Sequence, residues 1–294
     1  MRAGDPLLVA LLARCSFPPS GPVVCGLSGG ADSLALVALA VAGGLDVTAI
    51  HVDHGLRPDS TDEAHTVAGL AGQLGVALVR RRVDVSAGAN VEERARRARH
   101  DALGAGALLG HTADDRAETL LINLLRGAGT AGLSAMGPGP TRPILGLRRH
   151  ETAALCAHLG LTPVIDPTNE DRRYVRNRIR HEVLPLLADV AGRDVVALLN
   201  RTADVVAADA RALRQALDGL VTADARVLAA LPEDVAAAAV RHWLLDAGER
   251  PDRDGVARVL AVARGRQRAC ELPGGHRVER HQQHLRIIAG HAVS

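Results

Sequence analysis

A glycine-rich loop near the start of the sequence has the residue types that bind phosphate. It lies between two apolar runs, and its residues are Ser28, Gly29, Gly30, Ala31, Asp32 and Ser33. The glycines permit a tight turn and the close approach of an anion, and the serines add hydroxyl donors. Asp32, at the start of a predicted helix, can cap that helix or hold a magnesium ion that bridges phosphate oxygens. The alternative interpretation is a plain strand-to-helix turn with an aspartate cap.

A second segment, residues 110–120, carries two carboxylates three residues apart. Asp115 and Glu118 would share one face of a helix, where paired carboxylates can hold an ammonium group or a metal ion. Thr112 and Asp115 could instead form a capping box, which would explain Asp115 without any ligand. Glu118 has no such explanation, so the spacing favours a binding site.

Polar side chains also mark the end of a predicted strand. The residues concerned are His51, Asp53, His54 and Arg57. In a doubly wound sheet the carboxyl ends of the strands face the ligand crevice, which favours a turn that faces a nucleotide. Ordinary polarity at a strand end is the alternative.

An arginine-rich segment lies further along the chain, at residues 172–181. A charge run of this kind usually means a solvated helix face. With Tyr174 and an asparagine beside them, the guanidinium groups also make a credible clamp for phosphate and carboxylate groups. The candidate residues are Arg176, Asn177, Arg178 and Arg180, and a basic surface could be extended by Arg94, Arg96, Arg97 and Arg99.

Strands and helices must position these groups, and residues 20–110 alternate between sequences typical of each. Short β-branched or aliphatic runs alternate with longer Ala- and Leu-rich stretches, which is typical of a parallel α/β sheet. The predicted strands are residues 23–27, 47–52, 76–79 and 107–109. The predicted helices are residues 32–41, 61–74, 91–103 and 112–126. The fold class is therefore α/β, a doubly wound, Rossmann-like parallel sheet.

The alternation ends at the glycine-rich stretch 127–132. A helix is predicted at residues 148–159, and a turn at 166–169 opens a segment that ends at Pro185. Later helices are predicted at residues 194–217, 234–245 and 255–263, and short antiparallel strands at 268–272, 277–280 and 285–288. We expect two domains, residues 1–190 and a smaller, mainly helical domain of residues 191–294.

The composition is that of a globular protein with a sizeable core. Of the 294 residues 47% are hydrophobic, and no run of about 18 apolar residues predicts a membrane span. Arg14 interrupts the first apolar run, so we expect no export signal and a cytoplasmic protein. The four cysteines are too scattered for a metal or redox motif and are expected to be buried. All 35 basic residues are arginine, which excludes a Walker-type loop because that loop needs a lysine.

The glycine-rich loop resembles the PP-loop of the N-type ATP-pyrophosphatases, which cleave ATP between the α and β phosphates and adenylate an oxygen of a second substrate. With four later motifs, the sequence resembles the tRNA(Ile)-lysidine synthases over roughly residues 20–187. Three of these motifs are H-x-D-H-G-L-R at 51–57, G-H-x-x-D-D-x-x-E-T at 110–119 and G-x-G-T at 127–130. The last combines D-P-T-N at 166–169 with Y-x-R-N-x-I-R at 174–180. The combination is much more specific than any one motif.

The resemblance implies that ATP and Mg²⁺ support the attachment of free L-lysine to C2 of the wobble cytidine, in the isoleucine tRNA with a CAU anticodon. It implies a PP-loop catalytic domain, an appended helical domain that binds tRNA and no membrane partner, and it allows a homodimer. The implied ATP site is the loop 28–33 with His51, Asp53 and His54, and Asp32 holds the magnesium ion. The implied catalytic residues are Asp32, Asp115, Glu118 and Arg176. The implied contacts to lysine or tRNA are Asp115, Glu118, Arg57, Arg176, Asn177, Arg178 and Arg180.

Three other functions use related loops. A PP-loop tRNA thiolase would also adenylate a nucleobase oxygen, but its cytidine-modifying members carry C-x-x-C pairs, which this chain lacks. A GMP or NAD synthetase would bring a glutamine-hydrolysing or a distinct dimerisation segment, and the sequence shows neither. A non-catalytic nucleotide-binding module is the third alternative, and the acidic residues Asp32, Asp115 and Glu118 argue against it.

Overall fold

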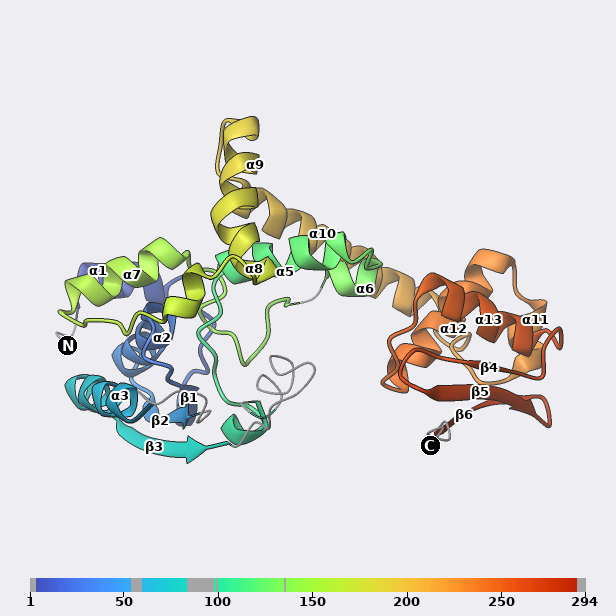
Figure 1. The fold of residues 1–294 in the computed structure, drawn as a ribbon, viewed down its shortest axis with the longest axis horizontal. Helices are drawn as coiled ribbons and strands as arrows, with labels where there is room; N and C mark the ends of the chain where they lie inside the picture. The colour runs from blue at the N-terminus through green and yellow to red at the C-terminus, as the bar shows by residue number, and fades with distance from the viewer. Residues whose placement is uncertain (1–3, 54–59, 84–97, 99, 135, 290–294) are drawn as a thin grey trace. The chain divides into compact units, whose positions relative to one another are not determined.

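The computed structural model describes residues 4–53, 60–83, 98, 100–134 and 136–289 (Figure 1). His54 and Arg57 of the predicted site lie outside these residues, as do the arginines expected to extend the basic surface, Arg94, Arg96, Arg97 and Arg99. The chain forms two compact units, Met1–Ala207 and Ala208–Ser294. The predicted boundary lies at residue 190, whereas the two units divide inside helix α10 (Val195–Ala216).

The first unit is built on a parallel sheet in the order β1-β2-β3. Its strands are β1 (Pro22–Gly26), β2 (Asp46–Asp53) and β3 (Ala77–Arg82). The predicted fourth strand is reduced to a single parallel bridge between Leu108 and Cys25 of β1. Since β2 occupies one side of β1, this bridge lies on the other side. The strand order therefore reverses at β1, and open α/β sheets bind ligands at such a point.

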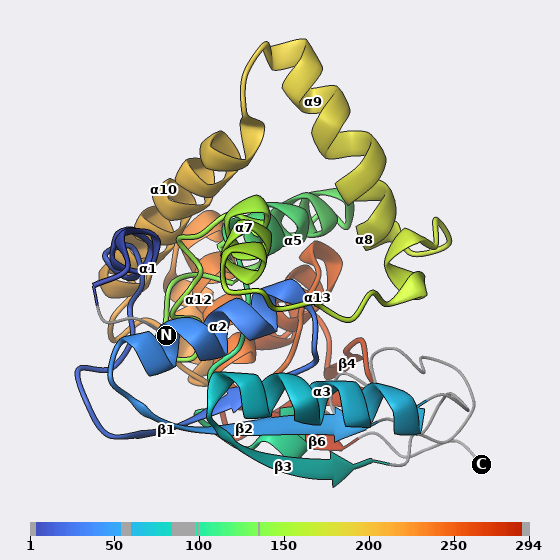
Figure 2. The same ribbon diagram turned by 90° about the vertical axis from the view of Figure 1, so that its left-hand side faces the viewer.

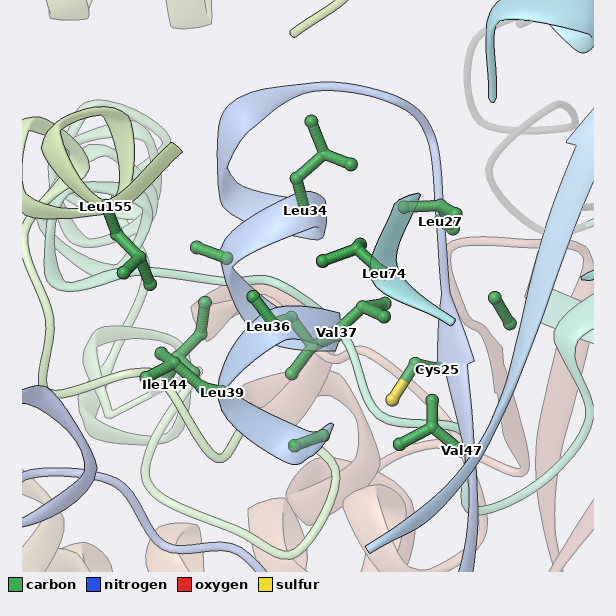
Figure 3. Packing of buried hydrophobic residues seen from close by; sticks show 14 of the residues in the cluster. Cys25, Leu27, Leu34, Leu36, Val37, Leu39, Val47, Leu74, Ile144 and Leu155 are labelled. Atoms are coloured by element: carbon green, nitrogen blue, oxygen red, sulfur yellow. The ribbon is translucent and has the colours of Figure 1, made fainter. Parts of the chain in front are cut away.

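Helix α2 (Ala31–Ala42) forms the centre of the hydrophobic core. Every residue from Ser33 to Ala40 is buried, and a helix that is apolar on all sides must be covered on all sides. The sheet covers one side, and α1 (Pro6–Leu12) and α7 (Arg149–His158) pack against α2 as well. In Figure 3, Leu36 and Leu39 of α2 lie between Cys25 of β1 and Leu155 of α7.

The two faces of the sheet are covered by different segments. Helices α2 and α3 (Ser60–Leu74) lie on one face (Figure 2). On the other face Ile50 packs with Leu103 and Ala107. Of the helix predicted at 91–103, the described residues 98 and 100–103 are helical. The predicted fold class, a parallel sheet with helices on both faces, is confirmed.

A helical layer that the sequence predicted only in part completes the first unit. Helix α5 (Ala113–Leu125) was expected, while the short helix α6 (Thr130–Leu133) falls in the predicted glycine-rich loop. After the 3-10 turn η1 (Pro167–Glu170), three unpredicted elements form one continuous helical rod (Figure 2). The rod consists of α8 (Val175–Arg178), the π-helical turn η2 (Ile179–Val183) and α9 (Leu184–Ala191).

The second unit has helices followed by strands, as predicted. Its helices are α11 (Ala225–Ala230), α12 (Glu233–Asp246) and α13 (Arg253–Ala263). They are followed by an antiparallel sheet of β4 (Ala269–Glu271), β5 (His276–His281) and β6 (His284–Ala289). Its core includes Leu244 of α12, Val259 of α13 and Val278 of β5. This unit therefore has a hydrophobic core of its own.

Two expectations from the composition can be compared with the described residues. The cysteines are free thiols, and Cys25, Cys156 and Cys270 are buried, as predicted for small apolar residues, whereas Cys15 is only half-buried. Within the described ranges, no helix combines the length and the apolar character that crossing a membrane requires.

Candidate active site

The phosphate loop connects β1 to the N-terminus of α2. Gly29 has a φ of 86°, and a Cβ atom added there would lie 2.9 Å from Val164, so both conformation and space require glycine. Ser33 Oγ donates to the Gly30 carbonyl at 2.9 Å and accepts from Ser28 N at 3.2 Å. No described side chain caps α2 at Gly30. The first N–H groups of α2 are therefore arranged as an anion site.

The segment that leads into α5 crosses the start of α2 at close range. A Cβ atom added to Gly110 would lie 2.7 Å from the carbonyl oxygen of Asp32 and 3.0 Å from Ser33 N. Real Cβ atoms do not approach backbone so closely. Glycine at position 110 thus allows α5, with its two acidic residues, to begin directly beside the phosphate loop.

The Gly110→Ala substitution tests this close approach. We expect it to lower the free energy of unfolding by about 1–3 kcal/mol, because overpacking forces the backbone apart, and to weaken ATP binding. Thermal unfolding and nucleotide titration measure the two effects. Gly72→Ala is the control, since a Cβ there meets nothing within 4 Å. Equal ATP affinity in the two variants would show that the close approach does not shape the loop.

Glu118 of α5 is fully buried, and three arginines surround it. Its Oε1 accepts hydrogen bonds from Arg149 at 2.9 Å and from Arg180 at 2.8 Å. Its Oε2 accepts from Arg176 at 2.7 Å and again from Arg180 at 3.2 Å. Arg176 and Arg180 are four residues apart in the helical rod, so both side chains reach the same carboxylate.

Asp115 uses its two oxygens for two purposes. Oδ2 accepts from the backbone N and the hydroxyl of Thr112 at 2.8 and 2.9 Å, which caps α5. Oδ1 accepts from Arg149 at 2.9 Å and from Arg176 at 3.1 Å. Burial alone would raise the pKa of Asp115, but the charges of Arg149 and Arg176 outweigh burial and hold the pKa below its ordinary value. The capping and the binding interpretations of Asp115 thus apply together, one to each oxygen.

Asp32 of the phosphate loop faces the first turn of α7. The hydroxyl of Thr152 donates a hydrogen bond to its Oδ1, and Arg149 Nε lies 3.6 Å from its Oδ2. Burial raises the pKa of Asp32 from 3.8 to about 6, and the hydrogen bond from Thr152 lowers it only in part. A carboxylate that burial has made reluctant to ionise is suited to a bound cation.

The structure places the other predicted nucleotide contacts at the end of β2. His51 is buried, and its Nδ1 donates to the carbonyl oxygen of Leu27 at 3.0 Å. Because Leu27 directly precedes the phosphate loop, this bond supports the base of the loop. Asp53 is the last residue of β2.

The arginine-rich segment divides into an inner and an outer set. Arg176 and Arg180 face the acidic pair, whereas the Arg178 side chain is 62% exposed and pairs with Glu182. Asn177 is buried and donates to two backbone carbonyls of the preceding turn, at 2.7 and 2.9 Å. It therefore shapes the turn that leads into the rod.

Arg149 and Thr152 are site residues that the sequence did not reveal. Arg149 is the one described side chain that contacts Asp32, Asp115 and Glu118 together. It stands in the first turn of an ordinary amphipathic helix, with no glycine motif or paired spacing around it. Only the packing of α7 on α2 brings it to the phosphate loop.

Comparison with known proteins gives this geometry a family context. A model of the PP-loop domain matches residues 11–187, and a model of the TilS substrate binding domain matches residues 224–286. A tRNA(Ile)-lysidine synthase of Nocardia farcinica is 44% identical over 261 residues, which cover 83% of this chain and 82% of that protein. One of Mycobacterium tuberculosis is 42% identical over 288 residues, which cover 90% and 87%.

Among solved structures, a U34-tRNA thiolase from Methanococcus maripaludis with a [4Fe-4S] cluster has a similar fold. The TM-score is 0.52, and the match covers 67% of this chain and 78% of the thiolase chain. At 17% sequence identity this likeness concerns the fold alone.

Proposed function

Because this chain belongs to the tRNA(Ile)-lysidine synthase family, we propose that it attaches free L-lysine to C2 of the wobble cytidine in the isoleucine tRNA with a CAU anticodon. The family membership makes it an ATP-using ligase that forms a carbon–nitrogen bond. One observation supports the finer proposal most directly: Arg149 joins Asp32 of the phosphate loop to the acidic pair Asp115 and Glu118. A nucleotide site and a site for a cationic substrate thus adjoin within the first unit.

The reaction needs these two sites side by side. A C2 carbonyl of cytidine is amide-like and resists attack by an amine, whereas its adenylated oxygen is a good leaving group. The backbone N–H groups at the start of α2 would hold the phosphates of ATP during this adenylation. The lysine ε-amine, with a reference pKa near ~10.4, must then lose its proton before it attacks. Holding both reactants side by side lowers the entropic part of the barrier.

We assign lysine to the carboxylates and arginines around α5. Its α-ammonium group would contact Asp115 and Glu118, and its carboxylate would pair with Arg176, because a guanidinium fork matches a carboxylate. Arg180 would hold the Glu118 carboxylate in place beneath the substrate. The roles of Arg57, Arg178 and His54 in holding tRNA or nucleotide remain predictions.

Asp32 fits a magnesium ion that is shared with phosphates. The described residues contain no group of three or more His, Cys, Asp or Glu side chains that could hold a metal. A magnesium ion is commonly held by one or two carboxylates together with substrate phosphates, and Asp32 lies at the phosphate loop. When bound there, Mg²⁺ would neutralise charge on the phosphates.

The second unit is proposed to hold the tRNA. The match to a substrate binding domain falls within this unit, at residues 224–286. We propose, with the boundary predicted at residue 190, that residues 1–190 catalyse the reaction and residues 191–294 bind tRNA. A cytoplasmic location and a homodimer remain predictions.

Lysine transfer to tRNA tests the proposed function. The full chain is incubated with radiolabelled lysine, ATP and Mg²⁺, and with two transcripts that differ only at the wobble base. We expect label on the transcript with the CAU anticodon and none on the other. ATP binding without transfer to either transcript would overturn the proposal, and a tRNA thiolase or a nucleotide-binding module would give that result.

A further inference from the structure

Every oxygen of the acidic pair already accepts two hydrogen bonds. Glu118 accepts four, two on each oxygen, from Arg149, Arg176 and Arg180. Asp115 accepts two on Oδ2 from Thr112 and two on Oδ1 from arginines. A carboxylate has about four acceptor sites, so both groups are saturated. An ammonium group can bind this pair only if one of the present donors moves away.

The donors differ in how easily they can leave. The Thr112 bonds cap α5, so their loss would unwind the start of that helix. Arg176 and Arg180 project from the helical rod onto the acidic pair. Arg149 instead lies between the acidic pair and the phosphate loop, because its Nε faces Asp32 at 3.6 Å. Phosphates at the loop would therefore offer Arg149, more directly than the other arginines, a new anionic partner.

The charges around Asp115 and Glu118 also bear on whether an ammonium group can bind there. In the observed arrangement the three guanidinium groups match the three carboxylates that they contact, Asp32, Asp115 and Glu118, so the cluster carries a net charge of about zero. Such a cluster has no excess negative charge to attract an ammonium group. If Arg149 turns to the phosphates, it no longer places a positive charge beside Asp115 and Glu118. The departure of Arg149 also frees one acceptor site on each carboxylate.

We propose that Arg149 is a positioning residue that moves from the acidic pair to the phosphates of bound ATP and thereby opens Asp115 Oδ1 and Glu118 Oε1 to the α-ammonium group of lysine. This inference rests on the proposed function and deepens it. ATP and lysine then bind with positive coupling, and lysine binds well only beside ATP. The Arg149 side chain thereby couples the occupancy of the phosphate loop to that of the acidic pair.

Lysine binding to the full chain tests this coupling. Equilibrium dialysis with radiolabelled lysine is performed with and without α,β-methylene ATP and Mg²⁺. In the wild type we expect the nucleotide analogue to lower the Kd for lysine about 10-fold or more, within the range typical of coupled sites. In Arg149→Met the Kd should be nearly the same under both conditions and close to that of the nucleotide-bound wild type.

Two further variants make the result specific to Arg149. Arg14→Met removes another arginine that pairs with α7, through Glu151, and should retain the wild-type ratio of Kd values. Arg149→Lys keeps the positive charge but lacks the forked guanidinium group. Its ratio of lysine Kd values without and with nucleotide should lie between those of the wild type and Arg149→Met. This variant also serves as the test if Arg149→Met fails to fold, in which case a ratio equal to that of the wild type rejects the inference.

The outcomes separate the inference from the proposed function. If Arg149→Met keeps the wild-type ratio, or weakens lysine binding equally with and without nucleotide, the inference is overturned and Arg149 is merely structural. Lysine transfer by the wild-type chain is measured in parallel. If the wild-type chain transfers lysine but Arg149→Met keeps the wild-type ratio of Kd values, only the inference is rejected. If the wild-type chain neither transfers nor binds lysine, the proposed function is rejected and with it the inference.

Discussion

The Glu118→Gln variant is expected to lose about 100- to 1,000-fold in kcat/KM for lysine, since breaking a buried charge pair costs several kcal/mol. Glu118 is 0% exposed and its carboxylate balances Arg149, Arg176 and Arg180. Glutamine offers a single acceptor oxygen and no charge. The substitution therefore leaves uncompensated positive charge in a buried place, which should also lower the free energy of unfolding by about 3–5 kcal/mol.

Two measurements separate the effects of Glu118→Gln on binding and on stability. Steady-state kinetics with varied lysine give the apparent affinity for lysine, and urea unfolding gives the stability. Glu151→Gln is the control, because Glu151 pairs with Arg14 outside the site and glutamine can still cap α7. If Glu118→Gln folds and binds lysine as tightly as the wild type, Glu118 does not form the lysine pocket.

Features of the site that depend on local spacing could be predicted from the sequence. The phosphate loop is a turn between a strand and a helix, and its glycines and Asp32 lie within six residues. Asp115 and Glu118 lie on one helix face because of their spacing. In both cases the backbone conformation of one short segment fixes the geometry, so the motif contains the necessary information.

The arginine-rich segment shows where this local information ends. Arg172 and Arg173 are 77% and 87% exposed at their side chains, whereas Arg176 and Arg180 contact buried Glu118. The sequence presents all of them as one charge run. Their separation depends on a helical rod that was not predicted, partly because Pro185 suggested an end to the segment rather than a helix that continues through a π-helical turn.

The contacts of Arg149 and Gly110 could not be predicted, although Gly110 opens a recognised motif, because these contacts depend on long-range packing. Arg149 reaches the phosphate loop since α7 packs against α2, across more than one hundred residues of sequence. Gly110 needs to be glycine because a different helix begins at that point in space. Neither condition leaves a mark in the neighbouring residues.

The Asp32→Asn variant should be inactive and yet more stable than the wild type at about pH 7.5. Burial raises the pKa of Asp32 from 3.8 in the unfolded chain to about 6 in the folded chain. The folded state therefore binds more protons between these two values, and stability falls as the pH rises through that window. Above pH 6 the ionised carboxylate destabilises the fold by up to about 3 kcal/mol. Asparagine does not ionise, so this cost disappears.

Unfolding by urea at about pH 4 and about pH 7.5 tests the sign of this effect. The advantage of Asp32→Asn should be largest at the higher pH and should shrink toward zero at the lower one. Asp114→Asn is a control for which the opposite effect is expected. Burial alone would raise the pKa of Asp114, but its bonds with Arg148 outweigh burial and hold the pKa below its ordinary value. That variant should lose stability at about pH 7.5. Identical pH dependence of Asp32→Asn and the wild type would contradict the prediction.

A stabilised but inactive Asp32→Asn variant would explain why the chain carries a carboxylate at this position. A buried acid that weakens the fold is not retained for packing, since a neutral side chain of the same shape packs equally well. A bound cation would offset this cost, as the proposed magnesium ion would when phosphates occupy the loop. Release of pyrophosphate in the presence of tRNA measures that step directly. Wild-type rates of release from Asp32→Asn would show that the carboxylate has no part in it.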